Sequence, residues 1–108
     1  MAAMFAAVGV FVATPAVASP IGDCRNYVVC LYNTGGQLVG QYSEYTDYYQ
    51  QISRTDVASV RNATPGAVYF NYATGVNSCV LGGRTADLLI AGYGRVTGIR
   101  ITSSQTCF

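Results

Sequence analysis

One pattern of short strands and glycine turns occurs twice in this chain, and that repeat constrains the fold more than any other feature. "VVCLYNTGGQLVG" in the first half aligns with "AVYFNYATGVNS" in the second, with Tyr32 over Phe70. Further along, "DVASVR" aligns with "RVTGIR", which puts Val57 over Val96. The offset is 38 or 39 residues, which predicts two copies of one supersecondary unit. The alternative is chance similarity between β-rich segments.

Both copies have the composition of β structure. β-Branched and aromatic runs alternate with Gly, Asn and Pro, and no helical period is sustained after the apolar start. Thr64-Pro65-Gly66 is the strongest interior break and separates the copies. We therefore predict an all-β sandwich of two tandem Greek-key motifs, at about residues 24–63 and 67–102. The predicted strands cover residues 27–32, 38–42, 56–62, 67–72, 76–81, 88–91 and 95–101.

The first residues have the features of a signal peptide. An apolar run from Met4 to Val12 precedes the small-residue pattern Ala16-Val17-Ala18. The run is shorter than the ~20 apolar residues of a membrane span. No Lys or Arg precedes it, which departs from the usual pattern. We expect residues 1–18 to be removed and residues 19–108 to form a secreted, extracellular domain with no membrane anchor.

Four cysteines suit a small exported domain. A mature chain of about 90 residues buries a modest core, so covalent links are expected to support it. The four cysteines allow three pairings. The preferred one joins Cys24 to Cys30 and Cys79 to Cys107, because the first pair brackets a local stretch. A zinc site is disfavoured, since the chain has no His and C-x5-C is not a usual zinc spacing.

Composition also narrows the function. The absence of His removes the commonest general base and metal ligand. The net charge is +1, with scattered Arg and no Lys, so no basic stripe indicates nucleic acid. The carboxylates form no recognisable motif; they are Asp23, Glu44, Asp47, Asp56 and Asp87. The sequence therefore favours a binding protein without a cofactor over an enzyme.

Two sets of residues resemble a known family. An aromatic strand, a Gly turn, the return Leu38-Val39-Gly40 and a later Ser-bearing strand resemble the Greek key of βγ-crystallins. Cys24-x5-Cys30, followed by Leu31-Tyr32 and Thr34-Gly35, resembles secreted bacterial proteinase inhibitors of the I36 type. That family includes metalloproteinase inhibitors of actinomycetes with a crystallin-like fold. The resemblance covers most of the mature chain, and its specific motif lies in the first third.

The resemblance implies a protease-binding loop. The family is thought to present a Cys–Val bond on a disulfide-anchored loop, and the matching residues here are Ser78, Cys79, Val80 and Leu81. Val80 would supply the bulky apolar residue that thermolysin-like enzymes prefer after the cleaved bond, and Arg84 would contact the enzyme at the rim. The family closes this loop with a nearby cysteine. Here Gly82-Gly83-Arg84 stands in that place, and the remaining cysteine is Cys107.

The expected partner is a secreted protease, and the expected state is a monomer. On this reading the loop is exposed, and Val80→Asp weakens inhibition without unfolding the domain. Gly82-Gly83 is expected to form a flexible turn. The alternative function is a killer-toxin-like or antimicrobial module of the same fold, which acts through arginines or tyrosines.

A third interpretation is a structural module with degenerate calcium motifs, of which Asp56-x-x-Ser59 keeps half a site. Tyr42, Tyr45, Tyr48 and Tyr49 are interpreted as cover for the edge of the core rather than as a carbohydrate platform. Asn62-Ala63-Thr64 fits a glycosylation sequon, but Pro65 follows directly and no glycan is expected.

Overall fold

The computed structural model describes residues 24–107, so the predicted signal peptide lies outside the described residues. The described chain is all-β, and it contains no helix long and apolar enough to cross a membrane. The strands are β1 (Val29–Tyr32), β2 (Leu38–Tyr42), β3 (Gln50–Gln51), β4 (Ser59–Asn62), β5 (Val68–Tyr72), β6 (Asn77–Val80), β7 (Thr85–Asp87) and β8 (Val96–Ile101).

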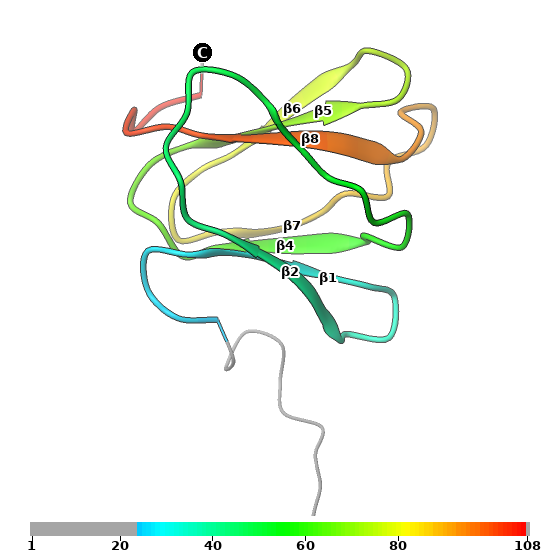
Figure 1. Cartoon of the computed structure of the whole chain (residues 1–108), viewed down its shortest axis with the longest axis horizontal. Coiled ribbons are helices and arrows are strands. Elements are labelled where there is room, and N and C mark those ends of the chain that lie inside the picture. Colours follow the sequence, from blue (N-terminus) through cyan, green and yellow to red (C-terminus); the bar gives the residue numbers. More distant parts are fainter. Residues whose placement is uncertain (1–23, 108) are drawn as a thin grey trace, which may run out of the picture.

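The strands form two four-stranded antiparallel sheets that pack as a small sandwich, which confirms the predicted fold class (Figure 1). One sheet has the order β2-β1-β4-β7 and the other the order β3-β8-β5-β6. Each Greek key therefore places three strands in one sheet and its third strand in the other. This exchange joins the two copies, because neither sheet is complete without a strand from the other copy.

The repeat is present in the hydrogen bonding, with an offset of 39 residues. In the first hairpin Gly36 N–H donates to Asn33 C=O, and in the second Gly75 N–H donates to Tyr72 C=O. Both glycines have positive φ, 79° and 86°, a backbone conformation that side chains with a Cβ rarely adopt. Because of this register, Leu31 and not Tyr32 corresponds to Phe70. The predicted match of Tyr32 with Phe70 was wrong by one residue.

The sequence prediction was least accurate for the third strand of each key. The strand predicted at residues 88–91 is wrong, since β7 ends at Asp87. Strand β3 lies within a segment that was read as a connection. Ile52 and Leu88, directly after β3 and β7, donate their N–H groups to the carbonyls of Thr97 in β8 and of Ala58 just before β4. Both side chains are fully buried, so the exchanged strands are held by one large apolar residue each.

The core lies between the sheets and is drawn from both repeats. Val29 pairs with Asn62 in the first sheet, and Val68 pairs with Ile101 at the equivalent place in the second. The buried apolar residues of this cluster are Val29, Leu31, Ile52, Val57, Val60, Val68, Phe70, Tyr72, Val80, Leu88, Val96, Ile99 and Ile101. Alternate residues of β1, β5 and β8 supply most of it, as expected for strands with one face on a core.

Two disulfides lie outside this core. The structure pairs Cys24 with Cys30 and Cys79 with Cys107, which is the pairing that the sequence favoured. The first packs with Val28 and Tyr32 on the outer face of its sheet. The second spans 28 residues and joins the C-terminal segment to edge strand β6. In the chain-entropy model, closing a loop of that length stabilises the fold by roughly 3–4 kcal/mol.

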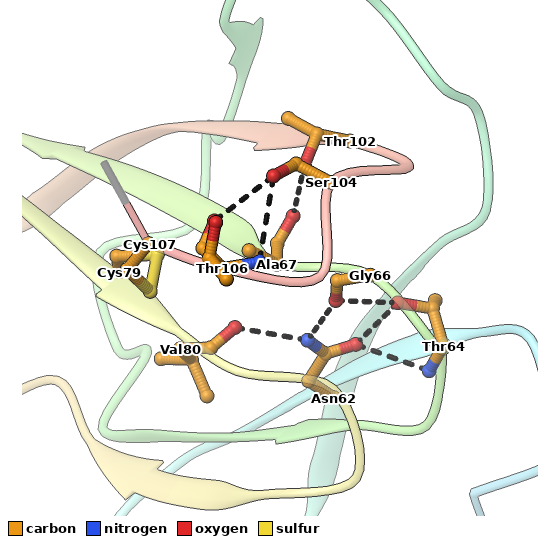
Figure 2. The surroundings of a disulfide bond; sticks show 10 residues. All are labelled: Asn62, Thr64, Gly66, Ala67, Cys79, Val80, Thr102, Ser104, Thr106 and Cys107. Carbon is orange, nitrogen blue, oxygen red and sulfur yellow. Dashed lines mark hydrogen bonds between the residues drawn. A yellow bond between two sulfur atoms is a disulfide. The ribbon is translucent and has the colours of Figure 1, made fainter.

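Asn62 is a buried polar residue at the end of β4, where the two Greek keys meet. Its amide group donates to the carbonyls of Gly66 (2.9 Å) and Val80 (3.0 Å). Its side-chain oxygen accepts hydrogen bonds from the Thr64 N–H and the Thr64 hydroxyl. Figure 2 shows this network beside the Cys79–Cys107 disulfide. One side chain thus joins the link between the keys to the end of β6, and its 0% exposure leaves no room for a glycan.

We predict that Asn62→Ala lowers the free energy of unfolding by about 2–4 kcal/mol, because buried carbonyls and a buried N–H lose their partner. Urea unfolding measures the change. Asn33→Ala is the matched control, since Asn33 also bonds the backbone of its own turn but does so in solvent. The control should lose less than about 1 kcal/mol. Equal losses in the two variants would contradict the role of burial.

Candidate functional site

The residues predicted to form an exposed protease-binding loop lie mostly in a strand. Asn77–Val80 is β6, and Val80 is 6% exposed and belongs to the core. Val80 pairs with Val68, whose side chain faces the other sheet, and a strand sends alternate residues to opposite faces. Ser78 also faces inward. Its hydroxyl is hydrogen-bonded to the Tyr72 hydroxyl at 3.0 Å, and burial raises the pKa of Tyr72 while this bond partly offsets the rise. The expectation of an exposed Val80 was therefore wrong.

We predict that Val80→Asp unfolds the domain or costs more than about 3 kcal/mol, because it buries an unpaired carboxylate. Leu81→Asp is the matched control one residue further on, where the side chain is 36% exposed. It should change stability by less than about 0.5 kcal/mol. Thermal unfolding followed by circular dichroism checks both. A Val80→Asp variant with unchanged unfolding would contradict the inward orientation of this side chain.

The exposed part of the predicted site is the turn that follows β6. Leu81 and Arg84 are both exposed and stand at the two ends of a tight turn through Gly82 and Gly83. Arg84 N–H donates to Leu81 C=O at 3.2 Å, and Gly83 has a φ of +78°. A positive φ at this position is the reason a glycine is needed there. Of the predicted site residues, Leu81 and Arg84 are thus presented together, while Ser78 and Cys79 are half-buried in β6 and Val80 is buried.

This turn is fixed to the body of the protein, contrary to the expectation that it is flexible. Arg61 Nη1 donates to Gly83 C=O at 2.7 Å. Gly83 N–H donates to Asn62 C=O, and Asn62 N–H donates to Arg84 C=O. Gly82 is also close-packed, since a Cβ there would lie 2.6 Å from the Pro65 carbonyl oxygen. We call Leu81–Arg84 the anchored turn.

A shallow cleft of about 350 Å³ adjoins the anchored turn. Its lining combines the turn glycines, the link between the two Greek keys and the loop closed by the first disulfide. The lining residues are Asn26, Tyr27, Ala63, Thr64, Pro65, Gly82 and Gly83. The cleft therefore brings together segments from three parts of the sequence, and no motif in any one of them indicated it.

Tyr27 stands at the rim of this cleft in a strained backbone conformation. Its φ is +68°, and it is the one non-glycine residue among 24–107 with positive φ. Its N–H donates to Ala63 C=O at 2.9 Å, and its side chain is 68% exposed. Residues held in sparsely populated backbone conformations cluster at active sites, ligand clamps and switch regions. The sequence analysis placed Tyr27 at the start of a strand over residues 27–32, which was wrong, since β1 begins at Val29 and Tyr27 lies in the turn before it.

In the weak calcium candidate Asp56-x-x-Ser59, the carboxylate is already engaged by an arginine. The Arg54 guanidinium donates two hydrogen bonds to the Asp56 carboxylate, at 2.9 and 2.7 Å. This hydrogen bonding is the main reason that the pKa of Asp56 is lowered. Ser59 lies in β4, half-buried between Tyr32 and Asp87 of the neighbouring strands. Across residues 24–107, no group of three or more acidic or cysteine side chains is placed to hold a metal.

The four predicted cover tyrosines separate into two kinds. Tyr42 packs against the core, and Tyr49 lies against the Arg100 guanidinium with 5.7 Å between the ring centroid and Cζ. Tyr42 fits the interpretation as core cover, while Tyr49 packs against an arginine side chain. Tyr45 and Tyr48 do not fit it, since they are 48% and 60% exposed.

Comparisons with known proteins leave the chain without a family. No protein-family model matches it, and neither a curated protein nor a solved structure does. The structure itself shows a small all-β protein of two four-stranded antiparallel sheets with two disulfides.

We predict that Tyr27→Asn raises the free energy of unfolding by roughly 0.5–1 kcal/mol, because Asn tolerates positive φ better than Tyr. For a domain of this size, that shift corresponds to a melting temperature higher by about 2–8 °C. Tyr48→Asn is the control, since Tyr48 is similarly exposed but has no positive φ. The interpretation of strain is wrong if the two variants change stability alike.

Proposed function

We propose that the protein is a secreted proteinase inhibitor, with a metalloproteinase as its target, and that it contacts the enzyme through the anchored turn. The single observation that carries this proposal is an exposed apolar residue, Leu81, at the start of a turn whose backbone is hydrogen-bonded to the body of the protein. The resemblance to I36-type inhibitors supports the choice of target. The two disulfides support an oxidising, extracellular setting.

The rigidity of the turn is what suits it to inhibition. Ordering a flexible loop on binding costs conformational entropy, and a loop fixed beforehand avoids most of that cost. Three hydrogen bonds fix the Gly83–Arg84 part of the turn, through Arg61 and Asn62. The Cys79–Cys107 disulfide fixes the strand that leads into it. A segment held in this way remains in place even if an enzyme cuts it.

In this proposal Leu81 takes the role that the sequence suggested for Val80. A thermolysin-like enzyme selects a bulky apolar residue after the cleaved bond, and Leu81 is the first such side chain beyond β6 that solvent reaches. Arg84 contacts the rim of the enzyme's cleft. The exposed ring of Tyr27 stands beside the same turn and adds an aromatic contact of the kind that is enriched at binding hot spots.

The test is a titration of a protease panel, including a thermolysin-like metalloenzyme, with the oxidised protein. We expect stoichiometric loss of one activity. Leu81→Asp should then raise the inhibition constant at least about tenfold, because a carboxylate is poorly accommodated in an apolar pocket. Leu89→Asp is the matched control: Leu89 is 59% exposed but lies outside the turn and its cleft.

Different outcomes of this titration test the inhibitory function and the location of the contact site separately. Inhibition that Leu81→Asp and Leu89→Asp weaken equally would mean that the anchored turn is not the contact. No loss of activity across the panel would overturn the inhibitor proposal. That result would favour the alternative function, an antimicrobial module of the same fold.

A further inference from the structure

A second cleft, separate from the anchored turn, lies where the segment between β2 and β3 crosses the end of β8. Its volume is about 270 Å³. Tyr45 forms a bridge with Ile101, and Thr46 N–H donates to Ile101 C=O at 3.4 Å, so the crossing segment is attached to β8. Figure 1 shows this segment (green) running across β8. The lining residues are Tyr45, Thr46, Asp47, Arg100, Ile101, Thr102 and Ser103.

Arg100 is the fixed group of this cleft. Its guanidinium lies over the rings of Tyr69 and Tyr49, with Cζ 4.7 and 5.7 Å from the two centroids. Aromatic rings within about 6 Å of a guanidinium hold it in place by cation–π attraction. Within residues 24–107 it forms no ion pair, since the one salt bridge there joins Arg54 to Asp56. A half-buried, oriented donor is therefore left available to a ligand.

The other groups of the cleft complement this donor. Asp47 is exposed and makes no salt bridge within the described residues, so its carboxylate is an available acceptor. Ser103 is also exposed. The two threonines are already engaged: Thr46 donates its hydroxyl hydrogen to Tyr48 C=O, and Thr102 donates its own to Ala67 C=O. Tyr45, which is 48% exposed, is the aromatic residue in the lining of the cleft.

We propose that this cleft binds a neutral pyranose sugar at the end of, or within, a longer glycan chain. A sugar ring presents an apolar face of C–H groups and an edge of hydroxyls that both donate and accept. Tyr45 offers an aromatic face for the first, while Arg100 donates to the hydroxyls and Asp47 accepts from them. The opposite charges of Arg100 and Asp47 balance each other, which favours a neutral sugar over an anionic one.

The size of the cleft fits a chain rather than an enclosed small molecule. Pockets that enclose drug-sized ligands hold about 300–1,000 Å³, and this cleft is smaller and open to solvent. It therefore covers one part of a ligand while the rest extends into solvent. The site shares no residue with the anchored turn, so glycan binding and protease inhibition are independent and the cleft would attach the domain to a polysaccharide surface.

The experiment is a titration of the ¹⁵N-labelled oxidised protein with cellohexaose, laminarihexaose and chitohexaose at millimolar concentrations, followed by NMR. We expect one of them to shift the amide signals of residues 45–47 and 101–103 and the Arg100 Nε–H signal. Heparin hexasaccharide is the anionic comparison. No shift with any of the three neutral sugars would overturn the proposal, and so would stronger binding of the anionic one.

Matched variants locate the binding. Tyr45→Ala should weaken the sugar at least about tenfold, and Asp47→Asn, which keeps the shape of the side chain, should weaken it by several-fold. Tyr48→Ala is the control, because Tyr48 is the more exposed ring of the same segment but does not line the cleft. Its affinity should stay within about twofold of the parent. Equal loss in Tyr45→Ala and Tyr48→Ala, or no loss in Asp47→Asn, would contradict the assignment.

Discussion

The hydrogen bonds of Asn62 are the constraint on which the arrangement of the two Greek keys and of the anchored turn depends. The side chain joins the link between the keys to the last carbonyl of β6, and the backbone of the same residue is bonded to Gly83 and Arg84. These hydrogen bonds from β4, the last strand of the first key, therefore fix the position at which Leu81 is exposed to solvent. A buried amide with every partner satisfied specifies one geometry, because any shift leaves a polar group unpaired.

Asn62 also marks where the symmetry of the repeat is broken. The pairing of Val29 with Asn62 corresponds to that of Val68 with Ile101, so an apolar side chain stands at the equivalent place in the second copy. The difference follows from what comes next in the chain. After Asn62 the chain must turn through Pro65 into the second key, and Gly66 packs so closely on the Thr102 carbonyl that a Cβ would overlap it. The carbonyls along this link therefore need a hydrogen-bond donor, which the Asn62 side chain supplies. After Ile101, by contrast, the Thr102 N–H donates to the Ala67 carbonyl.

The candidate site illustrates the limit of a motif transferred by resemblance. The sequence named Leu81 and Arg84 among the contact residues, and both are exposed on the anchored turn. It named Val80 as the contact residue, and that side chain lies in the core. In a strand, a shift of one residue reverses which face a side chain occupies, so Leu81 is exposed where Val80 is buried. Tyr27 was predicted to begin a strand but lies in a turn, where its N–H is bonded to Ala63, a residue far from it in the sequence.

The sequence by itself determined the all-β class, the repeat and the hairpin glycines, since these follow from local composition and from the spacing of apolar residues. It also favoured the disulfide pairing that the structure has. Only the tertiary structure decided the exchange of third strands, the positions of β3 and β7, the fixing of Gly82-Gly83 and the cleft around Arg100. Two- and three-residue strands carry too few side chains to show a period, and they are selected by the long-range burial of Ile52 and Leu88. Sites assembled from distant segments are likewise fixed by packing, which no single stretch of sequence contains.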